Sequence, residues 1–276
     1  DMGKRGSGPG MQLNSMVPVT PVVKALIIVC VVVWLGLQVI LEKYILSQPH
    51  VTFGLGLVPL SVIDKFFVWQ LFTYQFLHSF NIFHIVFNML LLWWLGSELE
   101  SRWGSKLFLA YYLFSGFGAG VIYVAVMATH GWITGTFTGW TTPVVGASGA
   151  IFGLMLAYGM LFGERIVYFM MVFPMRAKVF VAILGGVEVA TLLNSGLGNS
   201  QEANLAHLGG LASGFIFLKG YTWWQQRRWR KQSKVRGRGL KLVVNNEADG
   251  KNEPPDGSGG GPGGGSGGGS GPKYWN

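Results

Sequence analysis

Four polar side chains inside apolar stretches of the sequence have the types that acyl transfer requires. Ser148 stands in GASGAIFG, His207 in AHLGGLASG, and His84 and Asn88 in HIVFNML. A neutral imidazole can take the proton of a serine hydroxyl, and the oxyanion that then forms needs fixed hydrogen-bond donors. We expect Ser148 to be the nucleophile and His207 its base. The expected oxyanion donors are His84, Asn88 and the backbone N–H of Ser148.

Each of these residues also has an ordinary structural explanation. Glycine, alanine and serine are common where membrane helices approach closely, so GASG alone favours helix packing. His84, Asn88 and a lone His207 could each hydrogen-bond between helices. A catalytic role is favoured only if the fold brings all four side chains to one place.

The composition favours a membrane protein. Half of the 276 residues are hydrophobic, 12% are charged, and the mean hydropathy is +0.40, values that are unusual for a soluble domain. The single cysteine, Cys30, excludes an internal disulfide. The formal net charge of +9 reflects basic residues at the ends of apolar stretches, notably in residues 219–241. We interpret them as topology signals and expect no nucleic-acid partner.

Six apolar stretches predict the helices that carry these side chains. Most approach the ~20 residues that a helix needs to span a bilayer, but the fourth is short at about 15. The sequence therefore predicts an all-α, polytopic membrane protein with a six-helix bundle. The stretches are residues 22–41, 82–99, 107–128, 148–162, 177–193 and 203–222.

Four segments are expected along the chain. The six-helix domain covers residues 22–222 and follows a cytoplasmic N-terminal segment, 1–21. A basic juxtamembrane segment, 223–244, leads to a tail, 245–276, whose glycine and serine repeats are typical of a disordered coil. Within the domain, the long aromatic connection 44–80 is expected to lie in the membrane interface.

The loop charges indicate the orientation of the helices. Cationic residues follow the second, fourth and sixth stretches, and the alternate connections carry few. By the positive-inside rule both termini are cytoplasmic, and we expect the bacterial cytoplasmic (inner) membrane. The second, fourth and sixth helices then begin on the outer side. The four polar residues, each near the start of one of these helices, share one depth, which favours chemistry over separate helix contacts.

The short fourth stretch indicates water near Ser148. About 15 residues with a rise of 1.5 Å span only ~22 Å of a ~30 Å hydrocarbon core. We therefore expect Ser148 below the outer surface, after an irregular segment that is buried in protein or lines a water-filled cavity. Two other intramembrane chemistries are excluded by the sequence, because no histidine is followed by glutamate, as H-E-x-x-H requires, and every aspartate lies outside the apolar stretches. We expect no metal and no cofactor.

Together, the motifs resemble those of the rhomboid family of intramembrane serine proteases over residues 43–218. GASGAIFG is similar to the family's nucleophile segment, AHLGGLASG to its base segment and HIVFN to its oxyanion motif, and LESRWG, GER and FPMRAK are similar as well. The resemblance implies a Ser148–His207 dyad without a catalytic aspartate. Its substrates would be single-pass transmembrane proteins, surrounded by membrane lipid and cut near the outer membrane face.

The resemblance also implies residues that pack around the site. Phe152 would pack against the base histidine, and Gly210 and Gly214 would let the sixth helix press on the fourth. Gly146 and Gly149, which flank the nucleophile, belong to the same packing set. No oligomeric state is predicted.

Two further positions bear on how the resemblance is interpreted. Gln70 stands where many family members carry an arginine, so the anchoring of the connection 44–80 is not predicted. Glu188 is a carboxylate within the fifth stretch, where an ionisable residue invites a functional interpretation. A protonated or water-bonded structural group is the favoured alternative, because the family often shows a glutamate here.

Two functions from different classes remain. The chain is an active protease, or it is a catalytically silent rhomboid-like protein that binds membrane helices. Silent relatives typically lack the serine or the histidine, and both are present here, which favours the enzyme. A channel or transporter ranks third, because the sequence lacks paired inverted halves and a charged pathway.

Overall fold

The computed structural model describes residues 18–169, 173–195 and 202–237. The predictions for residues 1–17 and for the tail, 245–276, fall outside these described residues. By its contacts the chain divides into two units, which are Asp1–Arg228 and Trp229–Asn276. All of the expected site residues belong to the first unit.

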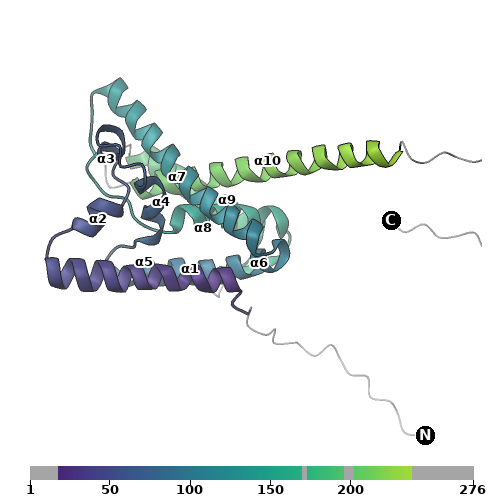
Figure 1. Ribbon diagram of the computed structural model, residues 1–276, viewed down its shortest axis with the longest axis horizontal. Coiled ribbons are helices and arrows are strands. Elements are labelled where there is room, and N and C mark those ends of the chain that lie inside the picture. Colours follow the sequence, from purple (N-terminus) through teal and green to yellow (C-terminus); the bar gives the residue numbers. More distant parts are fainter. Residues whose placement is uncertain (1–17, 170–172, 196–201, 238–276) are drawn as a thin grey trace, which may run out of the picture. The chain divides into compact units, whose positions relative to one another are not determined.

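All six apolar stretches are helical (Figure 1). The bounds are Pro21–Val32 (α1), Val33–Leu46 (η1), Ile82–Leu91 (α5), Leu92–Gly96 (η3), Ser97–Trp103 (α6), Ser105–Thr134 (α7), Ser148–Leu161 (α8), Ala177–Ser195 (α9) and Glu202–Gly237 (α10). The first stretch is α1 continued by the π-helical turns of η1. The second runs without a break through α5, η3 and α6. The sequence predicted the positions of these helices but not their π-helical turns.

Local sequence explains where several of these helices begin and end. Pro21 lies in the first turn of α1, where its missing N–H needs no partner. The side chain of Asn81 accepts a hydrogen bond from the Phe83 N–H at 3.0 Å and caps α5. Gly104, with φ +79°, separates α6 from α7, and Gly135, with φ +68°, ends α7. Glycine adopts such positive φ angles without steric cost.

Four helical spans within the described residues are long and apolar enough to cross a membrane. They are Pro21–Leu46, Ile82–Trp103, Ser105–Thr134 and Ala177–Asn194. α8 is apolar but has 14 residues, in keeping with the short fourth stretch. The mostly helical, polytopic fold expected from the sequence is confirmed. Six membrane crossings stay a prediction.

A short antiparallel hairpin connects α8 to α9, so the fold is not purely α-helical. Its strands are Ile166–Phe169 (β1) and Phe173–Arg176 (β2), with Ile166 paired to Arg176 and Val167 to Met175. β-Branched and aromatic residues favour strands, and they alternate here between exposed Ile166 and buried Val167. The hairpin was not predicted from the sequence, because four residues per strand are too few for a clear periodicity.

The connection between η1 and α5 is folded rather than irregular. It contains four short helical segments, which are His50–Leu55 (α2), Pro59–Asp64 (α3), Gln70–Thr73 (α4) and Tyr74–Phe76 (η2). Several of its aromatic side chains are exposed, among them Phe66, Trp69 and Phe72. This pattern agrees with a partly structured element. Its location in the membrane interface stays a prediction.

Gln70 anchors this connection. Its side chain is fully buried; Oε1 accepts from the Val58 N–H at 3.1 Å, and Nε2 donates to the Phe53 carbonyl at 2.8 Å. The amide of Gln38 on η1 forms a second anchor, because it exchanges two 2.8 Å hydrogen bonds with the backbone N–H and C=O of His78. An arginine at position 70 is therefore not needed to hold the connection.

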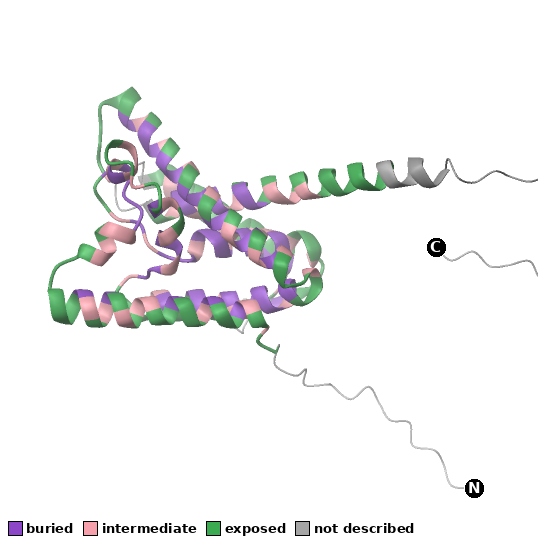
Figure 2. Cartoon of the chain, in the orientation of Figure 1, coloured by how far each residue is buried: buried purple, intermediate pink, exposed green. Residues whose placement is uncertain are grey.

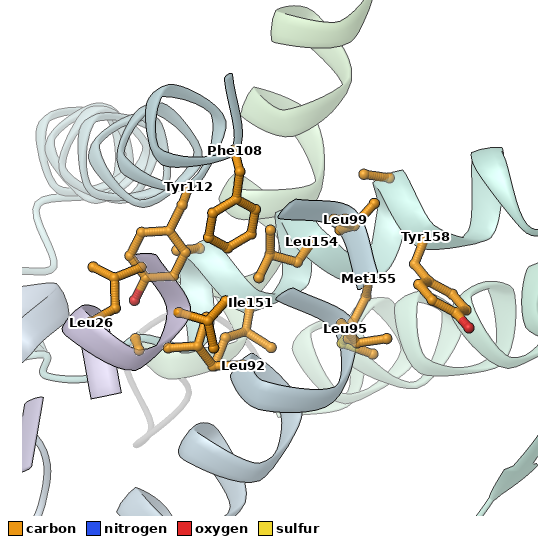
Figure 3. Packing of buried hydrophobic residues seen from close by; sticks show 14 of the residues in the cluster. Leu26, Leu92, Leu95, Leu99, Phe108, Tyr112, Ile151, Leu154, Met155 and Tyr158 are labelled. Atoms are coloured by element: carbon orange, nitrogen blue, oxygen red, sulfur yellow. The ribbon is translucent and has the colours of Figure 1, made fainter. Parts of the chain in front are cut away.

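The core lies between α1, the second helical stretch, α7 and α8. Figure 3 shows the apolar side chains that meet there, including Leu26, Leu92, Leu99, Phe108 and Ile151. In Figure 2 the buried residues of α1 and η1 lie on the side that faces the other helices, and the opposite side is exposed. That exposed side is apolar, as a helix facing lipid requires.

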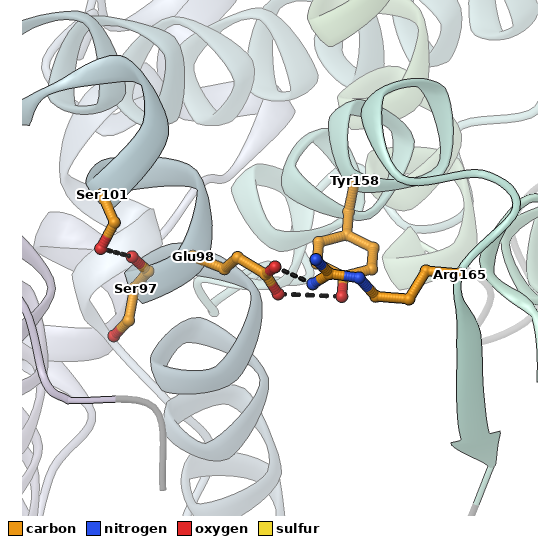
Figure 4. Close-up of polar contacts among 5 residues, drawn as sticks. All are labelled: Ser97, Glu98, Ser101, Tyr158 and Arg165. Carbon is orange, nitrogen blue, oxygen red and sulfur yellow. Dashed lines mark hydrogen bonds and ion pairs between the residues drawn. The ribbon is translucent and has the colours of Figure 1, made fainter. Parts of the chain in front are cut away.

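Polar contacts tie the ends of the helices together. Glu98 on α6 ion-pairs with Arg165 and accepts a hydrogen bond from the Tyr158 hydroxyl at 2.9 Å (Figure 4). Glu100 accepts from the Val22 and Val23 N–H groups at 3.1 and 3.0 Å. These contacts involve residues of the LESRWG and GER motifs, and they hold α1, α6 and the end of α8 in place around the core.

Candidate active site

Ser148 is the first residue of α8, and the segment before it is fixed by backbone contacts. Leu57 and Val144 exchange two 2.9 Å hydrogen bonds, and the Gly146 N–H donates to the Tyr74 carbonyl at 3.1 Å. Gly146 has φ +136°, and a Cβ there would lie 3.0 Å from Nε2 of His84. Only glycine fits this position, which places the His84 ring against the chain as it enters α8.

His207, in the second turn of α10, contacts Ser148 directly. Its Nε2 lies 2.8 Å from Ser148 Oγ, a hydrogen-bond distance. The fold thus brings together two residues that are far apart in sequence, as the proposed nucleophile and base would require. Both are partly rather than fully buried.

Close contact between α8 and α10 explains this pairing. A Cβ at Gly210 would lie 1.9 Å from the backbone oxygen of Gly149, and one at Gly214 would lie 2.5 Å from the hydroxyl of Tyr111. A Cβ at Gly149 would in turn meet the Cβ of Ala119 on α7 at 2.9 Å. Small residues at these positions let the helix backbones approach, as in other membrane helix contacts.

The imidazole of His207 has two further neighbours. The ring of Phe152, one turn after Ser148, stacks on it with centroids 4.3 Å apart and planes 11° from parallel. Its Nδ1 lies 3.0 Å from Oε1 of Glu188 on α9. The sequence singled out Glu188 but did not connect it with His207, because the register between α9 and α10 cannot be read from residue spacing.

His84 lies beside Gly146, just before α8, and has a defined tautomer. The Ser79 N–H donates to Nδ1 of His84 at 3.2 Å, and the Ser79 hydroxyl lies 2.9 Å from the same nitrogen. A backbone N–H can only donate, so Nδ1 is the acceptor and Nε2 of the neutral ring carries the proton. This N–H is on the side of Gly146, near Ser148.

Asn88 lies one helical turn after His84 and is buried. Its Nδ2 donates to the His84 carbonyl at 2.7 Å. In the described part of the chain, the amide therefore hydrogen-bonds to its own helix rather than to Ser148. A carboxamide nitrogen carries two N–H donors, and this contact uses one of them.

His78 is a buried histidine, and its ring lies next to that of His84. The two ring centroids lie 5.4 Å apart. Burial lowers the pKa of His78 to about 3, with a smaller contribution from the nearby His84. His78 is therefore uncharged at neutral pH and places no positive charge beside His84.

These elements define a polytopic membrane protein in which a serine at the start of a short helix is hydrogen-bonded to a histidine on a neighbouring helix. The chain belongs to the rhomboid family, because residues 65–224 match the Rhomboid domain. Together with its apolar helices, this makes it a multi-pass integral membrane protein.

Curated relatives agree with this membership. RHOMBOID-like protein 1 of Arabidopsis thaliana is 33% identical over 156 residues, which are 56% of this chain and 35% of the relative. Rhomboid protease GlpG of Salmonella choleraesuis (strain SC-B67) is 32% identical over 146 residues, which are 52% of this chain and 45% of the relative. The matched region is thus less than half the length of these relatives.

Proposed function

We propose that this chain is an intramembrane serine endopeptidase that cleaves transmembrane segments through a Ser148–His207 dyad. The observation that carries the proposal is the 2.8 Å contact between Ser148 Oγ and His207 Nε2. It occurs at the start of α8, a helix of 14 residues, which is about 21 Å long at 1.5 Å per residue. The nucleophile would therefore lie below the membrane surface, where a transmembrane segment can reach it. Relatives named rhomboid protease support the same activity.

The first chemical step would form an acyl-enzyme. Nε2 of His207 takes the proton of the Ser148 hydroxyl while Oγ bonds to the carbonyl carbon of the scissile peptide, whose π electrons move to its oxygen. The His207 Nε2–H then donates that proton to the leaving nitrogen as the C–N bond breaks. In the second step His207 takes a proton from water as the water oxygen bonds to the acyl carbon. His207 then returns that proton to Oγ of Ser148 as the ester bond breaks, which releases the acid and restores both side chains.

Three donors would stabilise the oxyanion of both steps. The backbone N–H of Ser148 is at the N-terminus of α8, where the helix dipole favours negative charge. His84 would add its Nε2–H, since the contact with Ser79 leaves Nδ1 as the acceptor. Asn88 would need to turn a side-chain N–H toward the substrate, because its amide donates to the backbone of its own helix. His84 is therefore the better supported of the two side chains.

The substrates would be single-pass transmembrane proteins. An extended segment is needed for attack at a peptide carbonyl, so we expect cleavage near the outer membrane face, where a substrate helix can unwind locally. We place the protein in the bacterial cytoplasmic membrane with both termini inside, in keeping with the basic residues that follow the second, fourth and sixth apolar stretches of the sequence. Membrane lipid would be the second partner of the protein and would contact its exposed apolar helix surfaces.

A fluorophosphonate probe tests the proposal on the purified, detergent-solubilised protein. We expect covalent labelling that maps to Ser148 and disappears in Ser148→Ala. Ser101→Ala is the matched control, because Ser101 hydrogen-bonds to the Ser97 carbonyl on α6 and lies outside the site. Absence of labelling, together with absence of cleavage of a transmembrane reporter, would instead favour a silent helix-binding protein.

A further inference from the structure

We propose that Glu188 is a positioning residue for His207, and that it acts as an ionised carboxylate. The inference rests on the proposed function. Oε1 of Glu188 lies 3.0 Å from Nδ1 of His207, and Nε2 of the same ring lies 2.8 Å from Ser148 Oγ. The three side chains, from α9, α10 and α8, thus form a continuous hydrogen-bonded chain that ends at the nucleophile.

The donor and acceptor roles along this chain follow from elementary chemistry. A neutral imidazole has one N–H and one lone pair, and an ionised carboxylate can only accept. If Glu188 is ionised, Nδ1 of His207 must carry the proton, and the lone pair of Nε2 must face the hydroxyl of Ser148. This is the tautomer that a general base requires. A protonated Glu188 would donate to Nδ1 and leave Nε2 as an N–H, which cannot take the serine proton.

The carboxylate also acts on charge during the reaction. When the proton moves from Oγ to Nε2, the ring becomes an imidazolium while its Nδ1–H stays bonded to Glu188. The proton stays on His207 until the leaving nitrogen receives it, so Glu188 itself remains unprotonated. An opposite charge at this distance stabilises the imidazolium more strongly in a poorly solvated site than in water.

The surroundings of this contact are poorly solvated, so the charge of Glu188 would act strongly on His207. The side chains of Glu188 and His207 are only 15% and 16% exposed. Oε2 of Glu188 is buried without a hydrogen-bond partner among the described residues, which is costly for a carboxylate inside a membrane protein. The stacking of Phe152 holds the ring in the plane that both contacts need.

Kinetics of Glu188→Gln and Glu188→Asp provide the first test. Glutamine keeps the size of the side chain but can donate to Nδ1, so we expect kcat for a transmembrane reporter to fall by about 10²- to 10⁴-fold, as for loss of a triad carboxylate. KM should change little, because Glu188 would act on the substrate only through its contact with His207. Aspartate keeps the charge and should retain more activity than glutamine. Thr191→Val, on the same helix, is the matched control, because the hydroxyl of Thr191 donates to the Val187 carbonyl of its own helix.

The pH profile separates a charge effect from a structural one. Loss of the carboxylate should move the acidic limb of kcat/KM to lower pH in Glu188→Gln, since an imidazolium without its counter-charge forms less readily. Of the described residues, His84 on α5 also interacts electrostatically with His207, and it is unchanged in these variants. A glutamine variant with the wild-type kcat and the wild-type acidic limb would overturn the proposal.

Nitrogen NMR of ¹⁵N-histidine-labelled protein tests the tautomer without relying on activity. We expect His207 to be protonated at Nδ1 in the wild type and in Glu188→Asp, and to lose that preference in Glu188→Gln. A wild-type His207 protonated at Nε2 would contradict the proposal even if the protein cleaves its substrate. Failure of the wild type to cleave or to react with a fluorophosphonate would instead overturn the proposed function.

Discussion

The backbones of Gly210 on α10 and Gly149 on α8 are so close that a Cβ at Gly210 would lie 1.9 Å from the Gly149 oxygen. Gly149 directly follows Ser148, and Gly210 lies almost one turn after His207. The contact between these two glycines therefore sets the distance between Ser148 and His207. A side chain at either position would have to separate the helices that carry the two residues.

Gly210→Ala should consequently slow the reaction. A displacement of about 1 Å between catalytic groups can cost roughly 10²-fold in rate, and backbone atoms cannot move aside as a flexible side chain does. The rate of fluorophosphonate labelling at Ser148 and the thermal unfolding midpoint measure the effect. Gly220→Ala is the control, since no atom of the described residues lies within 4 Å of a Cβ at that position of α10. Equal labelling rates in the two variants would show that the contact between Gly210 and Gly149 does not set the distance between Ser148 and His207.

The proposed oxyanion donors, His84 and Asn88, should affect turnover more than binding. Loss of one preorganised donor typically lowers kcat by about 10²- to 10³-fold, and the backbone N–H of Ser148 remains. We expect His84→Ala and Asn88→Ala each to give a slow but measurable enzyme with little change in KM, because the charge appears only in the transition state. His130→Ala, on α7, serves as the control. Wild-type turnover in both variants would show that these residues only join helices.

His78 should make stability depend on pH. Its folded pKa of about 3 lies below the ordinary value of 6.5, so the unfolded chain takes up a proton between these values while the folded chain does not. The contribution of His78 is present above pH 6.5 and is lost as the pH falls toward 3, by at most about 1.4 kcal/mol of unfolding free energy per pH unit. The thermal unfolding midpoint of the wild type should therefore decrease as the pH is lowered from 6.5 toward 3.

Two variants isolate the effect of His78. His78→Gln should show a smaller fall of the unfolding midpoint between pH 6.5 and about 3.5, a window inside the two pKa values, whatever its stability at neutral pH. His50→Gln changes an exposed histidine and should keep the wild-type pH dependence. If the unfolding midpoint changes equally with pH in the wild type and in both variants, His78 is not the group that causes the pH dependence.

The topology prediction rests on the distribution of lysine and arginine. A tag fused after Lys241 should be accessible only from the cytoplasm. A cysteine introduced as Thr138→Cys, at an exposed position between α7 and α8, should react with an impermeant reagent added from outside. Labelling of Thr138→Cys from the cytoplasmic side alone would place the start of α8 at the cytoplasmic membrane face and contradict cleavage near the outer face.

Much of the fold was predictable from the sequence because membrane helices have a strong local signal. Their length and apolarity located all six helical stretches, and the 14-residue α8 was expected from its short apolar run. The β1–β2 hairpin was not predicted, because its signal is short. The anchoring by Gln70 was not predicted either, since its partners, Val58 and Phe53, are backbone groups that only the folded connection brings near.

The candidate site was predictable in its residue types but not in its hydrogen bonds. Ser148, His84 and His207 were identified from motifs and from their shared position near helix starts. The contact between Ser79 and Nδ1 of His84, and that between Glu188 and Nδ1 of His207, depend on the placement of a loop and on the register of two helices. Packing sets both of these, and residue spacing does not encode them.

The most direct test of the Ser148–His207 dyad is the comparison of Ser148→Ala, His207→Ala and the double variant in cleavage of a transmembrane reporter by purified protein. If the two side chains act as one unit, as we propose, each single change should abolish nearly all turnover, and the double variant should be scarcely slower than either. Ser101→Ala should cleave at the wild-type rate. Measurable turnover by pure, folded Ser148→Ala, or losses that add in the double variant, would contradict the dyad.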